Sequence, residues 1–118
     1  MEPLYSDHAR LEERSLAMHR LIARKLRADP TLIDIARENV RRWKRIDGLS
    51  KAPLSEWEQI LDGGAAVVAR FLEERSERAA RLRQSSPFPG ILTDTERRTI
   101  YESYSARAYH PRREPNLG

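Results

Sequence analysis

The chain has no cysteine among its 118 residues, which excludes disulfide bonds, thiolate metal ligands and cysteine nucleophiles. It has no apolar run close to the roughly 20 residues that a membrane-spanning helix requires, and its N-terminus lacks an apolar signal-peptide segment. Stretches that alternate β-branched and aromatic residues between glycine turns are also missing. We therefore expect a soluble, cytoplasmic protein built from helices.

Lysine is scarce as well: arginine supplies 19 of the 22 basic side chains. The formal net charge is +4, charged residues make up 34% of the chain, and apolar residues make up 39%. Such a length and composition fit one small helical domain with a modest core. The arginines have two interpretations. They reflect a bias in composition, or their planar guanidinium groups pair with carboxylates or phosphates of a partner.

Hydrophobic periodicity and capping signals predict five or six helices. A first helix is expected over about 7–27, and a second runs from Asp29-Pro30, a strong start signal, to about Ile46. Trp43, on the apolar face of the second helix, is the expected core anchor. These two helices should form an antiparallel pair closed by the apolar helix around 65–72. The predicted core is Leu11, Met18, Ile22, Leu26, Ile35, Val40, Trp43, Trp57, Leu61, Val68, Phe71 and Leu72.

The remaining boundaries follow from turn and cap residues. Ser55 and Glu58 have the spacing of a capping box, which predicts a short helix that ends at Gly63-Gly64. After the apolar helix, the charged segment 73–83 continues the helix or restarts at Ser76. The two prolines of 85–90 exclude helix there. A last helix, capped by Thr93 with Glu96 or by Asp94, leads to a domain of residues 1–108 and an irregular tail over 109–118.

No catalytic constellation emerges from the sequence. His8 and His19 lie 11 residues apart on the first helix, about 16 Å, which is too far to share a metal ion. They and His110 are expected to be structural, solvated or contact residues. Ser85-Ser86 has no base nearby in sequence, so turn formation is the better interpretation. We expect no enzymatic activity, no metal and no cofactor.

The segment 82–90 combines Phe88, two rigid prolines and an Arg83-Gln84 pair. Such a preorganised loop loses little entropy on binding a partner. Phe88 either contacts a partner or folds back to plug the bundle, and the two interpretations are about equally supported. The tail has a tyrosine- and arginine-rich composition that is favoured at interfaces. The candidate partner-binding residues are Arg83, Gln84, Ser85, Pro87, Phe88, Arg107, Arg112 and Arg113.

A second candidate surface lies on the second helix. Three of its arginines have the i, i+4 spacing that could place guanidinium groups against DNA phosphates. Asp34 and Glu38 interrupt this row and can pair with the arginines within the helix. The alternative function is therefore a basic DNA-binding transcriptional regulator that uses Arg37, Arg41, Arg42 and Arg45.

Several segments taken together resemble a family of small helical bacterial proteins. The resemblance rests on 13–23, the Lys25-Leu26-Arg27 to Asp29-Pro30 turn, Arg42-Trp43, the step from Glu56-Trp57 to Leu61, and 82–88, within about residues 12–100. It implies an antitoxin encoded beside a nucleotidyltransferase-like toxin. An antitoxin of this kind neutralises its toxin by direct protein–protein binding and needs no active site.

Overall fold

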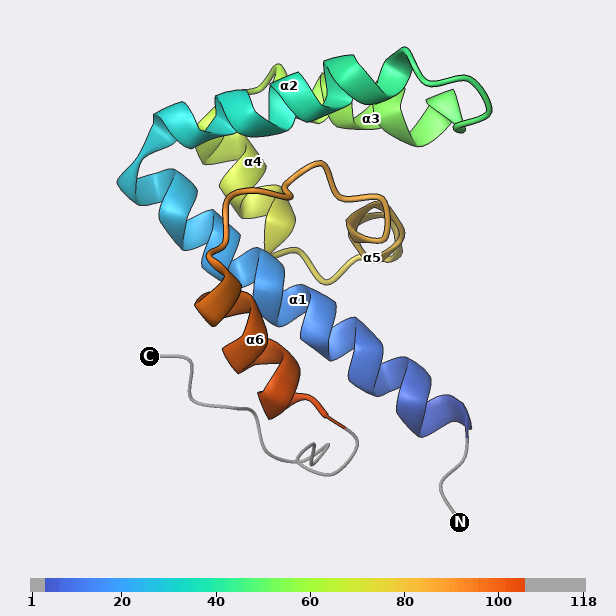
Figure 1. Ribbon diagram of the computed structural model, residues 1–118, viewed down its shortest axis with the longest axis vertical. Coiled ribbons are helices and arrows are strands. Elements are labelled where there is room, and N and C mark those ends of the chain that lie inside the picture. The colour runs from blue at the N-terminus through green and yellow to red at the C-terminus, as the bar shows by residue number, and fades with distance from the viewer. Residues whose placement is uncertain (1–3, 106–118) are drawn as a thin grey trace.

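Helices make up the regular structure of the chain (Figure 1). The computed structural model describes residues 4–105, with side chains from residue 7 onward. Its elements are α1 (Leu4–Ala28), a 3-10 turn (Pro30–Leu32), α2 (Ile33–Lys44), α3 (Lys51–Leu61), α4 (Ala65–Leu72), α5 (Glu77–Arg83) and α6 (Asp94–Ser103). Within these residues there is no strand, so the predicted all-α bundle is confirmed. The predicted boundary at 108 and the tail 109–118 lie outside the described residues.

None of the helices within residues 4–105 has both the length and the apolar character that crossing a membrane requires.

The chain turns sharply between α1 and α2, at the predicted start signal. The Asp29 carboxylate accepts hydrogen bonds from the Thr31 backbone N–H (3.1 Å) and the Thr31 hydroxyl (2.6 Å). Pro30 occupies the first position of the turn, where its missing N–H costs nothing. The chain therefore enters α2 through one 3-10 turn.

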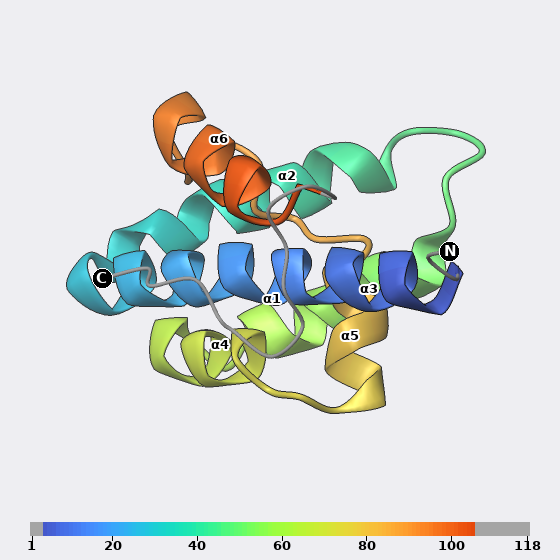
Figure 2. The same ribbon diagram turned by 90° about the horizontal axis from the view of Figure 1, so that it is seen from below.

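The helices pair differently from the prediction. The most extensive interface of α1 is with α4, while α2 packs along α3. In Figure 1, α1 and α2 meet at the corner and then diverge, so the predicted antiparallel pair is wrong. The apolar face of α2 is covered by α3 instead. Figure 2 shows α4 and α6 on opposite sides of α1.

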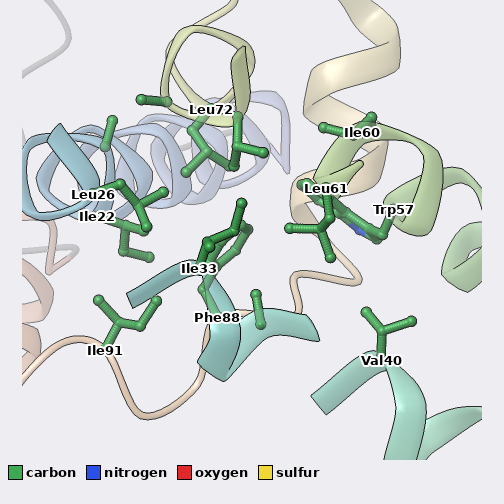
Figure 3. Packing of buried hydrophobic residues seen from close by; sticks show 14 of the residues in the cluster. Ile22, Leu26, Ile33, Val40, Trp57, Ile60, Leu61, Leu72, Phe88 and Ile91 are labelled. Atoms are coloured by element: carbon green, nitrogen blue, oxygen red, sulfur yellow. The ribbon is translucent and has the colours of Figure 1, made fainter. Parts of the chain in front are cut away.

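Trp57 of α3, and not Trp43, anchors the core. Its side chain is fully buried, and its indole N–H donates to the Leu82 carbonyl oxygen at 3.1 Å. The rings of Phe71 and Phe88 meet it edge to face, with centroids at 5.7 and 5.5 Å. Figure 3 shows Trp57 and Phe88 in the same cluster of buried side chains. Trp43 lies in the last turn of α2 and is only half-buried against this cluster, so its prediction as the anchor is wrong.

The rest of the predicted core divides into three groups. Six further members are buried: Ile22, Leu26, Val40, Leu61, Val68 and Leu72. Met18, Ile35 and Phe71 are partly buried against the clusters. Leu11 is 41% exposed, so its assignment to the core is wrong. Ile100 and Tyr104, which were not predicted, form a second cluster with Ala17 that holds α6 against α1.

Besides the Asp29 start, two further predicted helix starts are confirmed. Ser76 caps α5 by accepting from the Ala79 N–H at 3.1 Å, so the chain restarts there. Thr93 and Glu96 form a capping box at α6. The box predicted at Ser55 is wrong because α3 begins four residues earlier, at Lys51. Pro53 falls in the first turn of that helix, where it is tolerated.

Replacing Trp57 by alanine should lower the free energy of unfolding by about 3–5 kcal/mol, because it removes the largest buried side chain and leaves a cavity. The Trp43→Ala variant is the matched control and should cost clearly less. Urea denaturation followed by circular dichroism measures both. Equal losses for the two variants would contradict the assignment of Trp57 as the anchor.

Candidate binding groove along the first helix

A cavity of about 520 Å³ runs along α1 between α5, the 84–92 loop and α6. This volume lies in the range typical of ligand sites. We call it the α1 groove. Its lining residues are His8, Leu11, Glu12, Arg14, Ser15, Met18, His19, Ile22, Ala80, Arg83, Gln84, Ser86, Phe88, Pro89, Gly90, Leu92, Arg97 and Tyr101.

The floor of the groove is the apolar stripe of α1. The main core cluster takes Ile22, Ala23 and Leu26 from the C-terminal half of this helix. Toward the N-terminus the same stripe continues through Met18 to Leu11, and there it lines the groove. The periodicity that predicted Leu11 in the core therefore identified the correct face of the helix. That face borders a groove at Leu11 because the core ends before it.

The 84–92 loop forms one wall and is held to the bundle at several points. The Asn39 side-chain amide donates to the Pro87 and Pro89 carbonyl oxygens at 3.0 and 3.1 Å. Pro87 is fully buried, and Phe88 is 2% exposed between Trp57 and His19. Phe88 therefore plugs the bundle, as one of the two interpretations predicted, and its contact with a partner stays a prediction.

His19 ties this loop to α1. Its Nδ1 lies 2.7 Å from the Ser15 carbonyl oxygen, and its Nε2 lies 2.8 Å from Ser86 Oγ. A carbonyl can only accept, so Nδ1 carries the proton and Nε2 accepts from the Ser86 hydroxyl. Burial lowers the pKa of His19 to about 4, and the nearby positive charge of Arg83 acts in the same direction. The imidazole is therefore neutral at pH 7.

The Ser86–His19 distance matches that of a nucleophile and its base. Two features favour a positioning role instead. A pKa of about 4 makes the imidazole a weak base. The Ser86 oxygen also accepts from the Phe88 N–H at 3.4 Å, within its own loop. Both bonds of Ser86 hold the loop wall in place.

Arg83 lies at the α5 side of the groove and is only 7% exposed. Its Nη1 donates to the carbonyl oxygens of Leu72 and Glu74, at 3.4 and 2.7 Å, and so closes the C-terminal end of α4. Its Nε is buried without a hydrogen-bond partner among the described residues. Burial lowers the pKa of this guanidinium below its usual value, but a shifted arginine remains charged at pH 7.

The opposite wall carries a cation–aromatic pair. The Arg14 guanidinium of α1 lies 4.2 Å from the centroid of the Tyr101 ring of α6. Tyr101 is 45% exposed, and the neighbouring Arg97 pairs with Asp94 at 3.4 Å. This wall is thus basic and aromatic at its rim.

The other predicted contact residues differ in where they lie and in how far they are exposed. Arg83 and Pro87 are buried like Phe88; Arg83 and Phe88 line the groove, and Pro87 does not. Partner binding by these residues stays a prediction. Gln84 is exposed and lines the groove, and Ser85 is half-buried and does not line it. Arg107, Arg112 and Arg113 lie outside the described residues.

The arginine row on α2 is largely engaged within the chain. Arg37 pairs with Asp34 at 3.3 Å and donates to the Leu61 carbonyl, and Arg41 pairs with Glu38 at 3.2 Å. Arg42 donates to the Asn39 side chain at 2.7 Å. Arg45 is exposed. DNA binding by this row stays a prediction, and the pairing predicted with Asp34 and Glu38 is present.

Histidine and acidic side chains do not gather into a metal site: across the described part of the chain, no three of them lie close enough to hold an ion. His8 pairs with Glu12 at 3.1 Å on the surface of α1. The α1 groove combines apolar side chains with polar groups in one concave site.

Sequence reasoning missed several groove residues: Arg14, His19, Ser86 and Tyr101. His19 and Ser86 are 67 positions apart, and only the folded loop brings them together. For Arg14 and Tyr101 the available signal was an aromatic residue on the last helix, but nothing in the sequence placed that helix against α1.

The chain matches no family model, no curated protein and no solved structure. The resemblance to antitoxins therefore stays a prediction, and the groove itself carries the functional argument.

Truncating Phe88 to alanine should destabilise the protein by about 3–5 kcal/mol, because the ring fills the space between Trp57 and His19. Leu11→Ala, at a position first predicted as core but exposed in the groove, should change stability by no more than about 1 kcal/mol. Thermal unfolding of both variants checks this. A Phe88→Ala protein as stable as wild type would restore the partner-contact interpretation.

Acidification should weaken the fold through His19. The unfolded imidazole binds a proton near pH 6.5, whereas the folded one does so only near pH 4, so stability is present above pH 6.5 and is lost as the pH falls. Between pH 6.5 and 4.5 the loss should be on the order of 2–3 kcal/mol. His19→Gln should flatten this dependence in urea denaturation, and His8→Gln, on the exposed part of α1, should retain it. A wild-type slope in His19→Gln would refute the assignment.

Proposed function

We propose that the chain is a non-enzymatic, cytoplasmic bacterial binding protein of the antitoxin type. In this proposal it neutralises a partner toxin, a nucleotidyltransferase, by taking up a segment of that toxin in the α1 groove. The observation that carries the proposal is a groove with an exposed apolar floor between polar walls.

The exposed apolar side chains support partner binding. Leu11 is 41% exposed on the floor and Tyr101 is 45% exposed on the wall, and both face one concave surface. Apolar surface that is gathered in a groove and rimmed by polar groups is characteristic of interaction sites. The α2 arginines offer a weaker surface, since carboxylates of the same helix already pair with two of them.

The rigidity of the loop wall also supports this function. Two hydrogen bonds from Asn39, one from Ser86 to His19, and the buried Phe88 ring fix the 84–92 loop before any partner arrives. A preformed wall reduces the ordering cost that binding must overcome. In this proposal the 82–88 segment, one of those that carry the resemblance to antitoxins, shapes the groove. Exposed residues beside it, such as Leu11 and Tyr101, make the contacts with the partner.

Co-expression with the product of the neighbouring gene tests the proposal. The two proteins should co-purify, and Leu11→Asp should weaken the complex at least tenfold because it places a charge on the apolar floor. Val67→Asp is the matched control, since Val67 is 51% exposed on α4 and does not line the groove. Titration calorimetry gives the affinities.

Failure of the wild-type proteins to associate would reject the proposed function. Equal affinities for Leu11→Asp and wild type would reject the groove as the binding site.

A further inference from the structure

The groove contains a buried positive charge with no negative partner. Arg83 is nine-tenths buried, and no carboxylate oxygen of the described residues lies within ion-pair distance of it. Both of its hydrogen bonds leave from Nη1 toward backbone carbonyls, and its buried Nε has no acceptor. A buried guanidinium with an unsatisfied donor is costly unless an anion completes it.

The unsatisfied side of Arg83 has a definite shape. Because Nη1 is committed to the end of α4, the Nε edge has no partner within the described chain. Its Nε atom is buried, so a ligand reaches this edge when the side chain shifts toward the groove that Arg83 lines. The planar edge of a guanidinium matches the two oxygens of a carboxylate and can bind them with two parallel hydrogen bonds. Arg83 therefore has one half that bonds the end of α4 and one half whose hydrogen-bonding capacity is unsatisfied.

A second cation faces the same groove. Arg14 stacks on Tyr101 and forms no ion pair with the described carboxylates. The one glutamate that lines the groove, Glu12, lies 3.1 Å from His8 and contacts neither arginine directly, although its charge acts on Arg83 from a distance. Arg14 and Arg83 both line the groove, so it presents two guanidinium groups whose charge the described chain does not neutralise by direct contact.

Elsewhere in the described chain, acidic side chains are close to the arginines. Glu13 pairs with Arg75 at 3.0 Å, Glu73 with Arg27 at 2.7 Å, and Glu56 with Arg81 at 2.9 Å and Arg78 at 3.5 Å. Of the three arginines that line the groove, Arg97 pairs with Asp94, whereas Arg14 and Arg83 form no ion pair with the described residues. Arg42, Arg45, Arg70 and Arg98 form none either, but their side chains are exposed, whereas Arg83 is buried and Arg14 is half-buried. Charge complementarity therefore indicates an anionic occupant.

We propose that the α1 groove binds a carboxylate, the side chain of an aspartate or glutamate flanked by apolar residues in a segment of a protein partner, with Arg83 and Arg14 as its cationic contacts. This inference rests on the proposed function and names the chemistry of the bound segment. The flanking residues lie on Leu11, Met18 and Leu92. An apolar floor of this kind suits a peptide with one anionic group better than a polyanionic nucleic acid.

Two peptide pools test the proposal with the full chain. Both have a central position flanked by leucine, isoleucine, valine and phenylalanine; the centre is glutamate in one pool and glutamine in the other. The glutamate pool should bind at least tenfold more tightly in a fluorescence-anisotropy titration. When this pool is added, the protein's backbone amide resonances that shift in a heteronuclear NMR spectrum should belong to α1, α5 and α6.

Variants assign the preference to named residues. Arg83→Lys keeps a positive charge that can still reach the Glu74 carbonyl but lacks the planar edge, so the preference should fall below threefold. Arg14→Gln, at a half-buried position whose contact is the Tyr101 ring, should reduce it at least threefold without unfolding the protein. Arg41→Gln, on α2 and outside the groove, should keep the full preference.

Equal or undetectable binding of the two pools overturns the proposal, as does an undiminished preference in both Arg83→Lys and Arg14→Gln. Inorganic phosphate that displaces the glutamate pool at equal concentration would also overturn it in favour of a general oxyanion site. A different result rejects the proposed function: the wild-type chain does not bind its partner protein. If that complex forms, is lost in Leu11→Asp and is unchanged in Arg14→Gln and Arg83→Lys, only the carboxylate inference fails.

Discussion

The edge-to-face packing of Phe88 on Trp57 is the contact on which the rest of this structure depends. α1 and α2 diverge from their corner, and in Figure 1 α4, α5 and the 84–92 loop lie in the angle between them. The 84–92 loop fills that angle with one aromatic ring, which meets Trp57 on one side and His19 on the other. Because the same loop is the wall of the groove, the ring that completes the core also positions the site.

This arrangement explains what the sequence could predict. Helix periodicity and capping depend on residues three or four positions apart, so the helices, the Asp29 turn and the Thr93 box could be found. The role of Phe88 could not, because it is set by Trp57, 31 positions away, and by His19, 69 positions away. Two prolines beside an aromatic residue describe an exposed loop and a buried plug equally well. Trp43 was preferred over Trp57 for a similar reason: both lie on apolar faces, and only the pairing of α3 with α4 and the loop decides which face is central.

The arginine-rich composition has a largely internal explanation. Guanidinium groups bridge elements that are far apart in the chain, as Arg27 does from α1 to Glu73 after α4, and Arg81 from α5 to Glu56 in α3. These contacts are exposed and add little stability individually. They do account for positive charges that would otherwise suggest a nucleic-acid surface. Arg14 and Arg83 differ because they line the groove, are half-buried and buried, and have no such partner among the described residues.

The groove itself is a consequence of unequal helix lengths. α1 has 25 residues and α4 has 8, which correspond to about 37 and 12 Å of helix. The partner that buries the most of α1 can therefore cover only part of it, and α4 covers the end that contains Ile22 and Leu26. α6, α5 and the loop flank the remaining apolar stripe without closing over it, so Leu11 stays exposed. Shortening α1 would remove that apolar surface at no cost to the main core. The extra length of α1 therefore supplies the apolar side chains on the floor of the groove, beside the guanidinium groups of Arg14 and Arg83.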